Sequence, residues 1–347
     1  MIATTSSAAA WTAIKQANVE ALRARFCSRK RDNKPTPEEV VALRRWAGWV
    51  QMQRLFAPDG PEALLRSVRA LVTPSELDAG SRYAAVNAHW TPPEVAADVW
   101  TAVTTFGATS GARTVLEPSC GIGEFLFPAP QTVKMTGIEI DPATADIACL
   151  LFPAADVHTG SFGNVDLPDA HYELSVGNVP FSQEISTDQK YNAHRLPIAE
   201  HFLLKATRVV RPGGLVALIV PRRLLDARDS SVRERMTEFA SLVAAVRFPS
   251  HRSGVLDVPG VVADLVILRR RSPGSNPVSQ EPAWTIAAAI RGSSIQINEY
   301  FTHHPDQVLG VFIASGNCMK VVTDSEEPHI RLPRILADTL RAERTRG

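Results

Sequence analysis

The sequence predicts an α/β fold in which helices are wound around both faces of a mostly parallel sheet. Apolar, strand-like segments alternate with helical segments from residue 113 to residue 268, an order that is typical of consecutive βαβ units. A stretch of helical character, residues 8–72, precedes this alternation. The 347 residues are 45% hydrophobic and 21% charged, as expected for one large or two modest globular domains.

Composition also argues against several classes of protein. No apolar run reaches the roughly 18 residues that a membrane-spanning helix needs, and residues 1–10 lack the basic start and apolar core of a signal peptide. The cysteines form no C-x-x-C pair, so neither a zinc site nor a disulfide framework is indicated. They are Cys27, Cys120, Cys149 and Cys318. We therefore expect a cytoplasmic protein without a metal or a membrane partner.

The net charge of +1 hides an uneven distribution along the chain. Residues 81–204 hold 5 basic and 14 acidic side chains, whereas residues 205–271 hold 13 basic and 6 acidic ones. A basic segment beside an acidic one is compatible with an enzyme that binds nucleic acid. Charge blocks are also common on solvated faces, so this pattern alone does not identify a partner.

The order of helical and strand-like segments divides the chain into three parts. Residues 1–80 form a helical N-terminal region with a well-marked helix start at Thr36-Pro37-Glu38-Glu39, where a hydroxyl cap, a proline and acidic side chains occur together. Residues 81–271 hold the βαβ alternation. The proline-containing segment 272–282 marks a boundary, and residues 272–347 form a C-terminal extension without a catalytic signature.

The first ligand-binding signal follows the strand expected at residues 114–117. The segment 117–123 is a turn of small residues, after which we expect a short helix. Glycine at positions 121 and 123 lets the backbone approach a ligand closely, and N–H groups at a helix start attract a carboxylate. Thr91-Pro92-Pro93-Glu94 caps the helix that precedes this strand.

A second signal lies at the end of the next strand, residues 132–140. Glu139 lies 22 residues after Glu117, in the place where an acidic side chain at the end of a second strand accepts ribose hydroxyls. Asp141 precedes Pro142 and is expected to cap the following helix, which is a structural role. A third strand is expected near residues 155–158.

The segment Asn178-Val179-Pro180-Phe181 follows the apolar run 172–176. Proline has no N–H, so neighbouring carbonyls can point outward, while asparagine adds an acceptor and phenylalanine an aromatic face. Together these groups suit a planar substrate with an exocyclic amino group, whose lone pair could then attack an electrophilic methyl group. A proline-containing turn after a strand is also common as a purely structural element, so this interpretation depends on the two signals upstream.

The remaining segments complete the alternation. A polar loop, residues 182–197, precedes a helix at 198–210, and four strands are expected at 215–220, 242–248, 261–268 and 284–290. Arg222, Arg223 and Arg228 follow the strand 215–220 and belong to the basic segment. These three arginines are our candidates for contact with nucleic-acid phosphates.

The three signals resemble, in order and spacing, the motifs of S-adenosylmethionine-dependent adenine-N6 DNA methyltransferases, and the resemblance covers roughly residues 83–310. The variant Asn-Val-Pro-Phe is similar to methylase domains of phages and mobile elements, which are often fused to helicases. Val179 replaces the family's usual first proline. Ala199 stands where that variant has a histidine, so the resemblance does not settle what the helix 198–210 contributes to the site.

The resemblance implies a seven-stranded, Rossmann-like class I methyltransferase sheet, S-adenosyl-L-methionine as cofactor and DNA as partner, with the adenine flipped from the duplex. It implies catalytic roles for Asn178, Val179, Pro180 and Phe181. Asp156 and Phe162 are candidates for contact with the cofactor's adenine. The implied cofactor-binding residues are Trp90, Thr91, Glu117, Pro118, Ser119, Cys120, Gly121, Gly123, Glu139, Ile140, Phe162 and Asn178.

Two alternatives remain open. Related sites methylate RNA guanine or a protein glutamine amide, although phenylalanine at position 181 favours DNA. The other alternative is a catalytically inactive protein that binds the cofactor or DNA and has a protective or anti-restriction role, which the replacements at positions 179 and 199 keep open.

Overall fold

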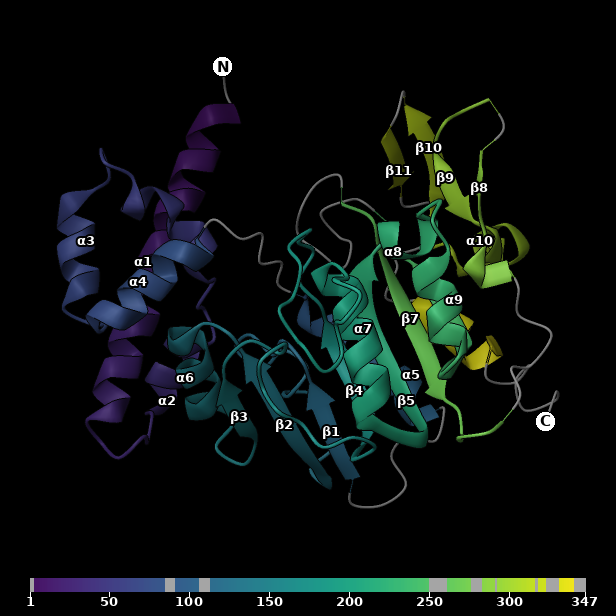
Figure 1. The fold of residues 1–347 in the computed structure, drawn as a ribbon. Coiled ribbons are helices and arrows are strands. Elements are labelled where there is room, and N and C mark those ends of the chain that lie inside the picture. Colours follow the sequence, from purple (N-terminus) through teal and green to yellow (C-terminus); the bar gives the residue numbers. More distant parts are fainter. Residues whose placement is uncertain are drawn as a thin grey trace.

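Seven strands form one sheet at the centre of the molecule, in the order β3-β2-β1-β4-β5-β7-β6 (Figure 1). The computed structural model describes residues 3–84, 91–105, 113–249, 261–275, 283–290, 292–315, 318–322 and 331–339. Strands β1 to β5 run parallel to one another, and β7 lies antiparallel between β5 and β6. The strands are β1 (Arg113–Glu117), β2 (Val133–Glu139), β3 (Asp156–Thr159), β4 (Tyr172–Asn178), β5 (Val210–Pro221), β6 (Ala240–Arg247) and β7 (Ala263–Arg270). The predicted α/β, Rossmann-like fold of a class I methyltransferase is confirmed.

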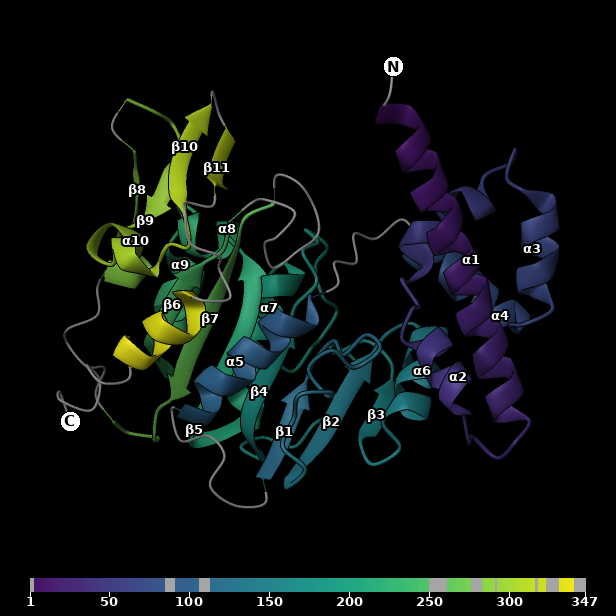
Figure 2. The same cartoon turned by 180° about the vertical axis from the view of Figure 1, so that it is seen from behind.

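Helices cover both faces of this sheet, as Figures 1 and 2 show from opposite sides. Helix α5 (Pro93–Thr105) and the helix at 331–339 pack on one face. Helices α7 (Ile198–Val209), α8 (Arg223–Asp226) and α9 (Ser231–Thr237) cover the other. Neighbouring strand residues such as Val115 and Leu116 belong to opposite cores because side chains alternate along a strand.

The N-terminal region packs against the β3 edge of the sheet through helix α6 (Pro142–Leu151) (Figure 1). Arg25 forms ion pairs with Asp146 on α6 and with Glu76 inside the region. Thr36 caps α2 as predicted, and Glu39 completes a capping box by accepting from the Thr36 backbone N–H. The region consists of α1 (Ala3–Arg29), α2 (Pro37–Leu43), a 3₁₀ segment (Trp49–Phe56), α3 (Glu62–Arg69) and α4 (Pro74–Tyr83).

The short helix expected after β1 does not form. Residues 118–129 make successive turns instead. Gly123 has φ +98°, outside the helical range, and a Cβ there would lie 2.4 Å from the Phe152 ring. Pro128 and Pro130 end the segment because proline cannot donate a helical hydrogen bond. The ligand-facing N–H groups of this segment therefore belong to a turn.

Two strand predictions need correction. Strand β5 begins at Val210, five residues before the expected start, and its register with β4 shifts so that residues 211–214 bulge out. The prediction of a strand at 284–290 is mostly wrong. Trp284 lies in a 3₁₀ turn (Ala283–Thr285), because its ring is buried in the core on the α7 side, and only β8 (Ala287–Ala289) is extended.

The C-terminal extension packs beside β6 and β7. Strand β8 pairs with β9 (Gln296–Asn298), followed by α10 (Glu299–His303) and a 3₁₀ turn (Pro305–Gln307). A second hairpin joins β10 (Val311–Ser315) to β11 (Cys318–Val322). Within the described part of the chain, no helix combines the length and apolar character needed to cross a membrane.

Candidate active site

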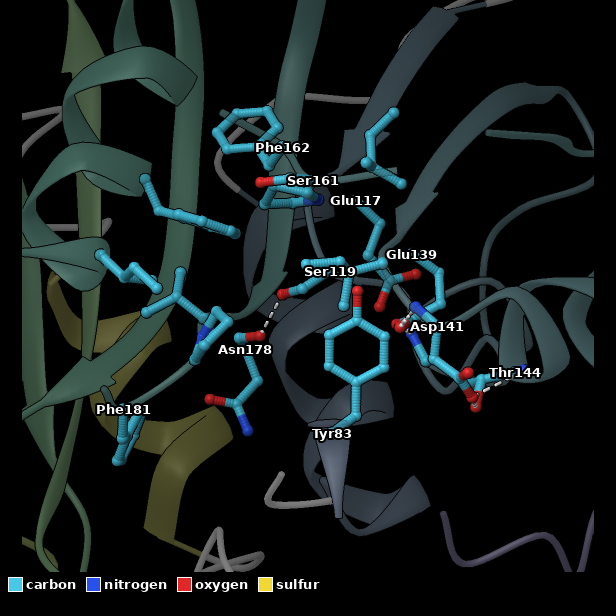
Figure 3. A pocket seen from close by; sticks show the side chains of 18 of the residues that line it. Tyr83, Glu117, Ser119, Glu139, Asp141, Thr144, Ser161, Phe162, Asn178 and Phe181 are labelled. Atoms are coloured by element: carbon cyan, nitrogen blue, oxygen red, sulfur yellow. Dashed lines mark hydrogen bonds between the residues drawn. The ribbon is translucent and has the colours of Figure 1, made fainter. Parts of the chain in front are cut away.

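A cavity of about 340 Å³ opens at the carboxyl ends of β1, β2, β3 and β4. Ligands of doubly wound sheets bind at this edge because the strand ends and the turns that follow them leave a crevice there. In Figure 3, Glu139, Asp141 and Thr144 lie on one side of the cavity, Phe181 lies on the other, and Asn178 lies between them. One cavity therefore brings together all three sequence signals.

Glu139 at the end of β2 is held in place by backbone donors. Its carboxylate oxygens accept hydrogen bonds from Gly121 N at 2.9 Å and Asp141 N at 2.8 Å. The left-handed φ of +55° at Gly121 turns that N–H toward the carboxylate. Burial raises the pKa of Glu139 to about 7, with the nearby Asp141 carboxylate adding to the shift. The carboxylate has further lone pairs for a ligand that donates hydrogen bonds.

The cavity is strongly acidic. Glu117 is 2% exposed, and one of its carboxylate oxygens has no hydrogen-bond partner among the described residues. Burial, followed by repulsion from Glu124 and Glu139, raises the pKa of the Glu117 carboxyl well above its usual range. No lysine, arginine or histidine is among the described residues that line the cavity. A ligand that carries positive charge and hydrogen-bond donors would compensate these carboxylates.

The other half of the cavity is built around Asn178. The Ser119 hydroxyl donates to the Asn178 carbonyl at 2.7 Å, which ties the end of β4 to the turn after β1. Val179 N donates to Ile219 O on β5, and the Val179 side chain is buried. Pro180 and Phe181 continue the wall of the cavity, and Phe181 is partly exposed. All four residues with predicted catalytic roles therefore line this cavity.

The N-terminal region supplies part of the cavity wall. Trp49 lines it and donates its indole N–H to Asp141 Oδ2 at 3.0 Å. Tyr83, the last residue of α4, points its ring into the cavity (Figure 3). Burial raises the pKa of Tyr83, and the carboxylates of Asp141 and Glu139 raise it further. Asp141 caps α6, as predicted, and also lines the cavity.

A buried ionic network lies behind the cavity and supports the loop 182–197. Asp188 accepts from the backbone N–H groups of Lys190 and Tyr191, which fixes the turn of the loop. Its other oxygen lies 3.0 Å from both His201 Nε2 and Lys205 Nζ on α7. The Lys205 ammonium also donates to the carbonyls of Phe162 at 2.6 Å and Val165 at 2.9 Å. One lysine thus connects the segment after β3 to the loop after β4.

Some predicted site residues lie elsewhere. Cys120 is buried and packs against Gly137, where a Cβ would lie 2.9 Å from its sulfur, so its side chain does not line the cavity. Gly123 packs against Phe152 and does not line it either. Trp90 lies outside the described residues, whereas Thr91 lines the cavity. Glu117, Pro118, Ser119, Gly121, Glu139, Ile140, Phe162 and Asn178 also line it.

The three candidate arginines lie outside the cavity. Arg222 pairs with Asp226 at 3.0 Å. Arg223 pairs with Glu200 at 2.7 Å and donates to the carbonyl of Ser182, one residue after Phe181. Arg228 is exposed. Their contact with nucleic acid stays a prediction.

Neither Asp156 nor His158 lines the cavity. These two side chains are exposed and bond to each other at 3.0 Å, so the structure gives Asp156 no place beside a ligand here. Phe162, the other residue considered with Asp156, is buried and forms part of the cavity wall.

Sequence reasoning missed several cavity residues. Trp49 and Tyr83 carry no local signal, because helical spacing places aromatic residues in cores far more often than in binding sites. Thr144, Ser161 and Phe202 also line the cavity, although no motif pointed to these three side chains. A signal existed only for Asp141, whose position two residues after Glu139 places it at the same strand end.

Comparisons with known proteins agree with this architecture. The chain is 31% identical over 193 residues, 53% of its length, to Defense against restriction protein B of Escherichia phage P1, a match that covers 8% of that protein. It is 26% identical over 168 residues, 46% of its length, to Type II methyltransferase M.CvrRI of Paramecium bursaria Chlorella virus XZ-6E, and covers 43% of it. The chain thus spans less than half the length of these curated relatives. No protein-family model matches it.

A solved structure shares the fold. The type I restriction-modification system methyltransferase subunit from Streptococcus thermophilus superimposes with a TM-score of 0.52 at 14% sequence identity. The match covers 92% of this chain and 73% of that subunit. At this level of identity the similarity shows that the two chains share a fold.

Proposed function

We propose that the protein transfers a methyl group from S-adenosyl-L-methionine to the N6 amino group of adenine in DNA. The observation that carries the proposal is the single cavity that joins the carboxylates of Glu117 and Glu139 to the segment Asn178–Phe181. One half has the groups to bind a cationic nucleoside, and the other has the groups to bind a planar base with an amino group.

The residues of the first half fit this cofactor. S-adenosyl-L-methionine supplies an electrophilic methyl group on a sulfonium, and it brings a positive charge into a cavity without described basic residues. Glu139 would accept the ribose hydroxyls, because its orientation is already set by Gly121 and Asp141. Glu117, with an uncompensated buried oxygen, would hold a donor or a cationic group at the other end.

The residues of the second half fit a flipped adenine. Asn178 and the carbonyl of Val179 would accept the two amino hydrogens, and the partly exposed Phe181 ring would stack on the base. The hydrogen bond from Ser119 holds the backbone of Asn178, so the acceptors are oriented before the base arrives. An aromatic ring contributes about 1–3 kcal/mol to binding an unstacked base. Orientation of the two reactants would supply most of the rate.

The names of the similar proteins support DNA as the substrate. One is called a type II methyltransferase, and the structural neighbour is called a methyltransferase subunit of a type I restriction-modification system. No described basic side chain in the cavity would pair with a phosphate, so the nucleic-acid backbone would stay outside while the neutral base enters. The Arg223 guanidinium, bonded to Ser182 beside Phe181, would be placed to contact that backbone.

A second candidate function is protection from restriction without methyl transfer. It is favoured by the 31% identity to a protein named for defence against restriction. On this alternative the cavity would bind the cofactor or DNA and catalysis would be absent.

Methyl transfer from tritiated S-adenosyl-L-methionine to DNA, RNA or protein separates these functions. We expect label in DNA, and its release as N6-methyladenine after nuclease digestion. Label in RNA or in glutamine would contradict the DNA assignment. Cofactor binding by calorimetry with no transfer to any of the three substrates would favour the protective role.

Asn178→Ala tests the catalytic assignment. We expect transfer to fall by roughly a hundred-fold or more, as for loss of an oriented transition-state contact, with cofactor affinity nearly unchanged. Phe181→Ala removes the stacking surface together with packing against both cores and should weaken DNA binding, whereas Phe181→Trp should keep much of the activity. A folded Asn178→Ala protein that transfers methyl groups at the wild-type rate would refute the assignment.

A further inference from the structure

A second cavity, of about 250 Å³, lies near the C-terminal end of α7 and shares no lining residue with the first. Its walls come from the loop 182–197, α7, α9 and the segments just before β4 and β6. They are Asp169, Lys190, Tyr191, Ala193, His194, Leu204, Arg208, Arg235 and Phe239.

The cavity holds more positive than negative charge. Lys190, Arg208 and Arg235 line it, whereas Asp169 is its one carboxylate among the described residues. That carboxylate is already engaged, because Lys190 Nζ lies 3.0 Å away and the Tyr191 hydroxyl donates to it. Arg235 forms no ion pair with any described carboxylate. The charge of Arg208 also acts on Asp169, so this single carboxylate faces both Lys190 and Arg208, and the cavity keeps an excess of positive charge.

Arg208 in particular has unused bonding capacity. Its Nε is buried and has no hydrogen-bond partner among the described residues, while its guanidinium lies 4.9 Å from the centre of the Phe239 ring. A buried guanidinium N–H that lacks an acceptor is costly, and an anion in the cavity would remove that cost.

Arg270 adds a second basic group close by. Its guanidinium donates to the carbonyls of Arg208 and Val210. Burial, and then the positive charge of Arg208, lowers the pKa of Arg270. The Asp169 carboxylate offsets part of the repulsion between these two guanidinium groups, and a further anion in the cavity would offset more of it.

We propose that this cavity binds a phosphate group, held by Arg208 and Arg235 with Lys190 at the rim. Guanidinium groups match the oxygens of a phosphate geometrically, and Phe239 and Tyr191 offer aromatic surface to an attached base or sugar. Such a phosphate is carried either by a nucleic-acid strand or by a free phosphate compound.

The test uses the full chain in two binding assays that do not require methyl transfer. Pyrophosphate binding is measured by calorimetry, and binding of a fluorescent DNA duplex is measured by anisotropy over a series of salt concentrations. The variant is R208Q/R235Q. The matched control is R66Q/R82Q, which removes two exposed arginines that pair within their own helices.

We expect R208Q/R235Q to bind at least one of the two ligands roughly tenfold or more weakly than the wild type, whereas the affinities of the control should be unchanged. Loss of pyrophosphate binding alone identifies a free phosphate compound. Weaker binding of the duplex, with the slope of log affinity against log salt concentration reduced by about one unit per lost contact, identifies nucleic acid. If neither ligand distinguishes the variant from the control, the proposal is wrong.

Two measurements keep this test independent of folding and of the first cavity. Cofactor affinity of the same preparations should be unchanged, whatever the outcome for methyl transfer. If the double variant unfolds, R235Q alone is used, because Arg235 is partly exposed and makes no ion pair among the described residues. Unchanged binding of both ligands by folded R235Q and by folded R208Q would equally overturn the proposal.

Discussion

At the scale of single residues, the candidate active site depends on carboxyl groups that are buried by folding, and burial disfavours their negatively charged form. Glu139 has a pKa of about 7, compared with an ordinary value of 4.5, because it is enclosed at the end of β2 and faces other acids. The protonated form is therefore favoured in the folded protein. The contribution of Glu139 to stability is fully present below about pH 4.5 and is lost as the pH rises through 7.

This pKa predicts that cofactor affinity depends on pH. The ionised carboxylate is the better acceptor for ribose hydroxyls, so affinity should increase by roughly tenfold between pH 6 and pH 8 as Glu139 loses its proton. Calorimetry at several pH values measures this. In Glu139→Ala the affinity should be about ten- to a hundred-fold lower and should no longer increase over this range. An equal increase in wild type and in a folded variant would assign the titration to another group.

At the scale of elements, the loop 182–197 and helix α7 act as one unit because Asp188 and Lys205 join them. Lys205 is 2% exposed, and its ammonium contacts the Asp188 carboxylate in the loop and two carbonyls in the segment after β3. Burial lowers the pKa of Lys205, and the Asp188 carboxylate opposes that shift. A buried pair of this kind contributes little net energy when intact but is costly to break, since one charge is left behind.

Lys205→Met should therefore lower the free energy of unfolding by about 3–5 kcal/mol. Adding Asp188→Asn, which removes the charge left behind, should recover part of this loss. Lys134→Met makes the same chemical change at an exposed position and should leave the unfolding midpoint nearly unchanged. Chemical denaturation measures all three. A Lys205→Met protein as stable as Lys134→Met would show that the network does not support the loop.

At the scale of the whole molecule, the N-terminal region completes the cavity of the α/β domain. Two tryptophans make matched contacts with α6. Trp46 donates to Thr144 Oγ1 at 2.9 Å, and Trp49 donates to Asp141 Oδ2 at 3.0 Å. Of the two, only Trp49 lines the cavity. Docking of this region and binding of a ligand are therefore expected to be linked.

The pair of tryptophans provides a direct test of this link. Trp46→Phe and Trp49→Phe each remove one buried indole donor, so each should lower the free energy of unfolding by about 1–3 kcal/mol. Only Trp49→Phe should also weaken cofactor binding, by about three- to tenfold, because it removes the indole donor from Asp141 at the cavity wall and leaves that carboxylate with the two bonds from Thr144. Calorimetry and thermal unfolding of the two variants measure this. Equal cofactor affinities would show that the region docks without influencing the site.

Much of the fold and the centre of the site followed from the sequence, because both depend on local patterns. Alternating burial and helix caps depend on neighbouring residues, so the seven strands of the sheet and the hydroxyl cap at Thr36 could be predicted. The carboxyl ends of parallel strands meet at one edge, so Glu117, Glu139 and Asn178 could be expected to converge.

Only the tertiary structure decided which distant segments complete the cavity and how charges are compensated. Trp49 reaches Asp141 across 92 positions of sequence, and Lys205 reaches Phe162 across 43, through packing that no local motif encodes. Gly123 was read as part of a ligand turn, but its conformation is set by the Phe152 ring against it. Contacts between residues far apart in sequence depend on how whole elements dock, and docking is determined by the summed burial of many side chains rather than by any short motif.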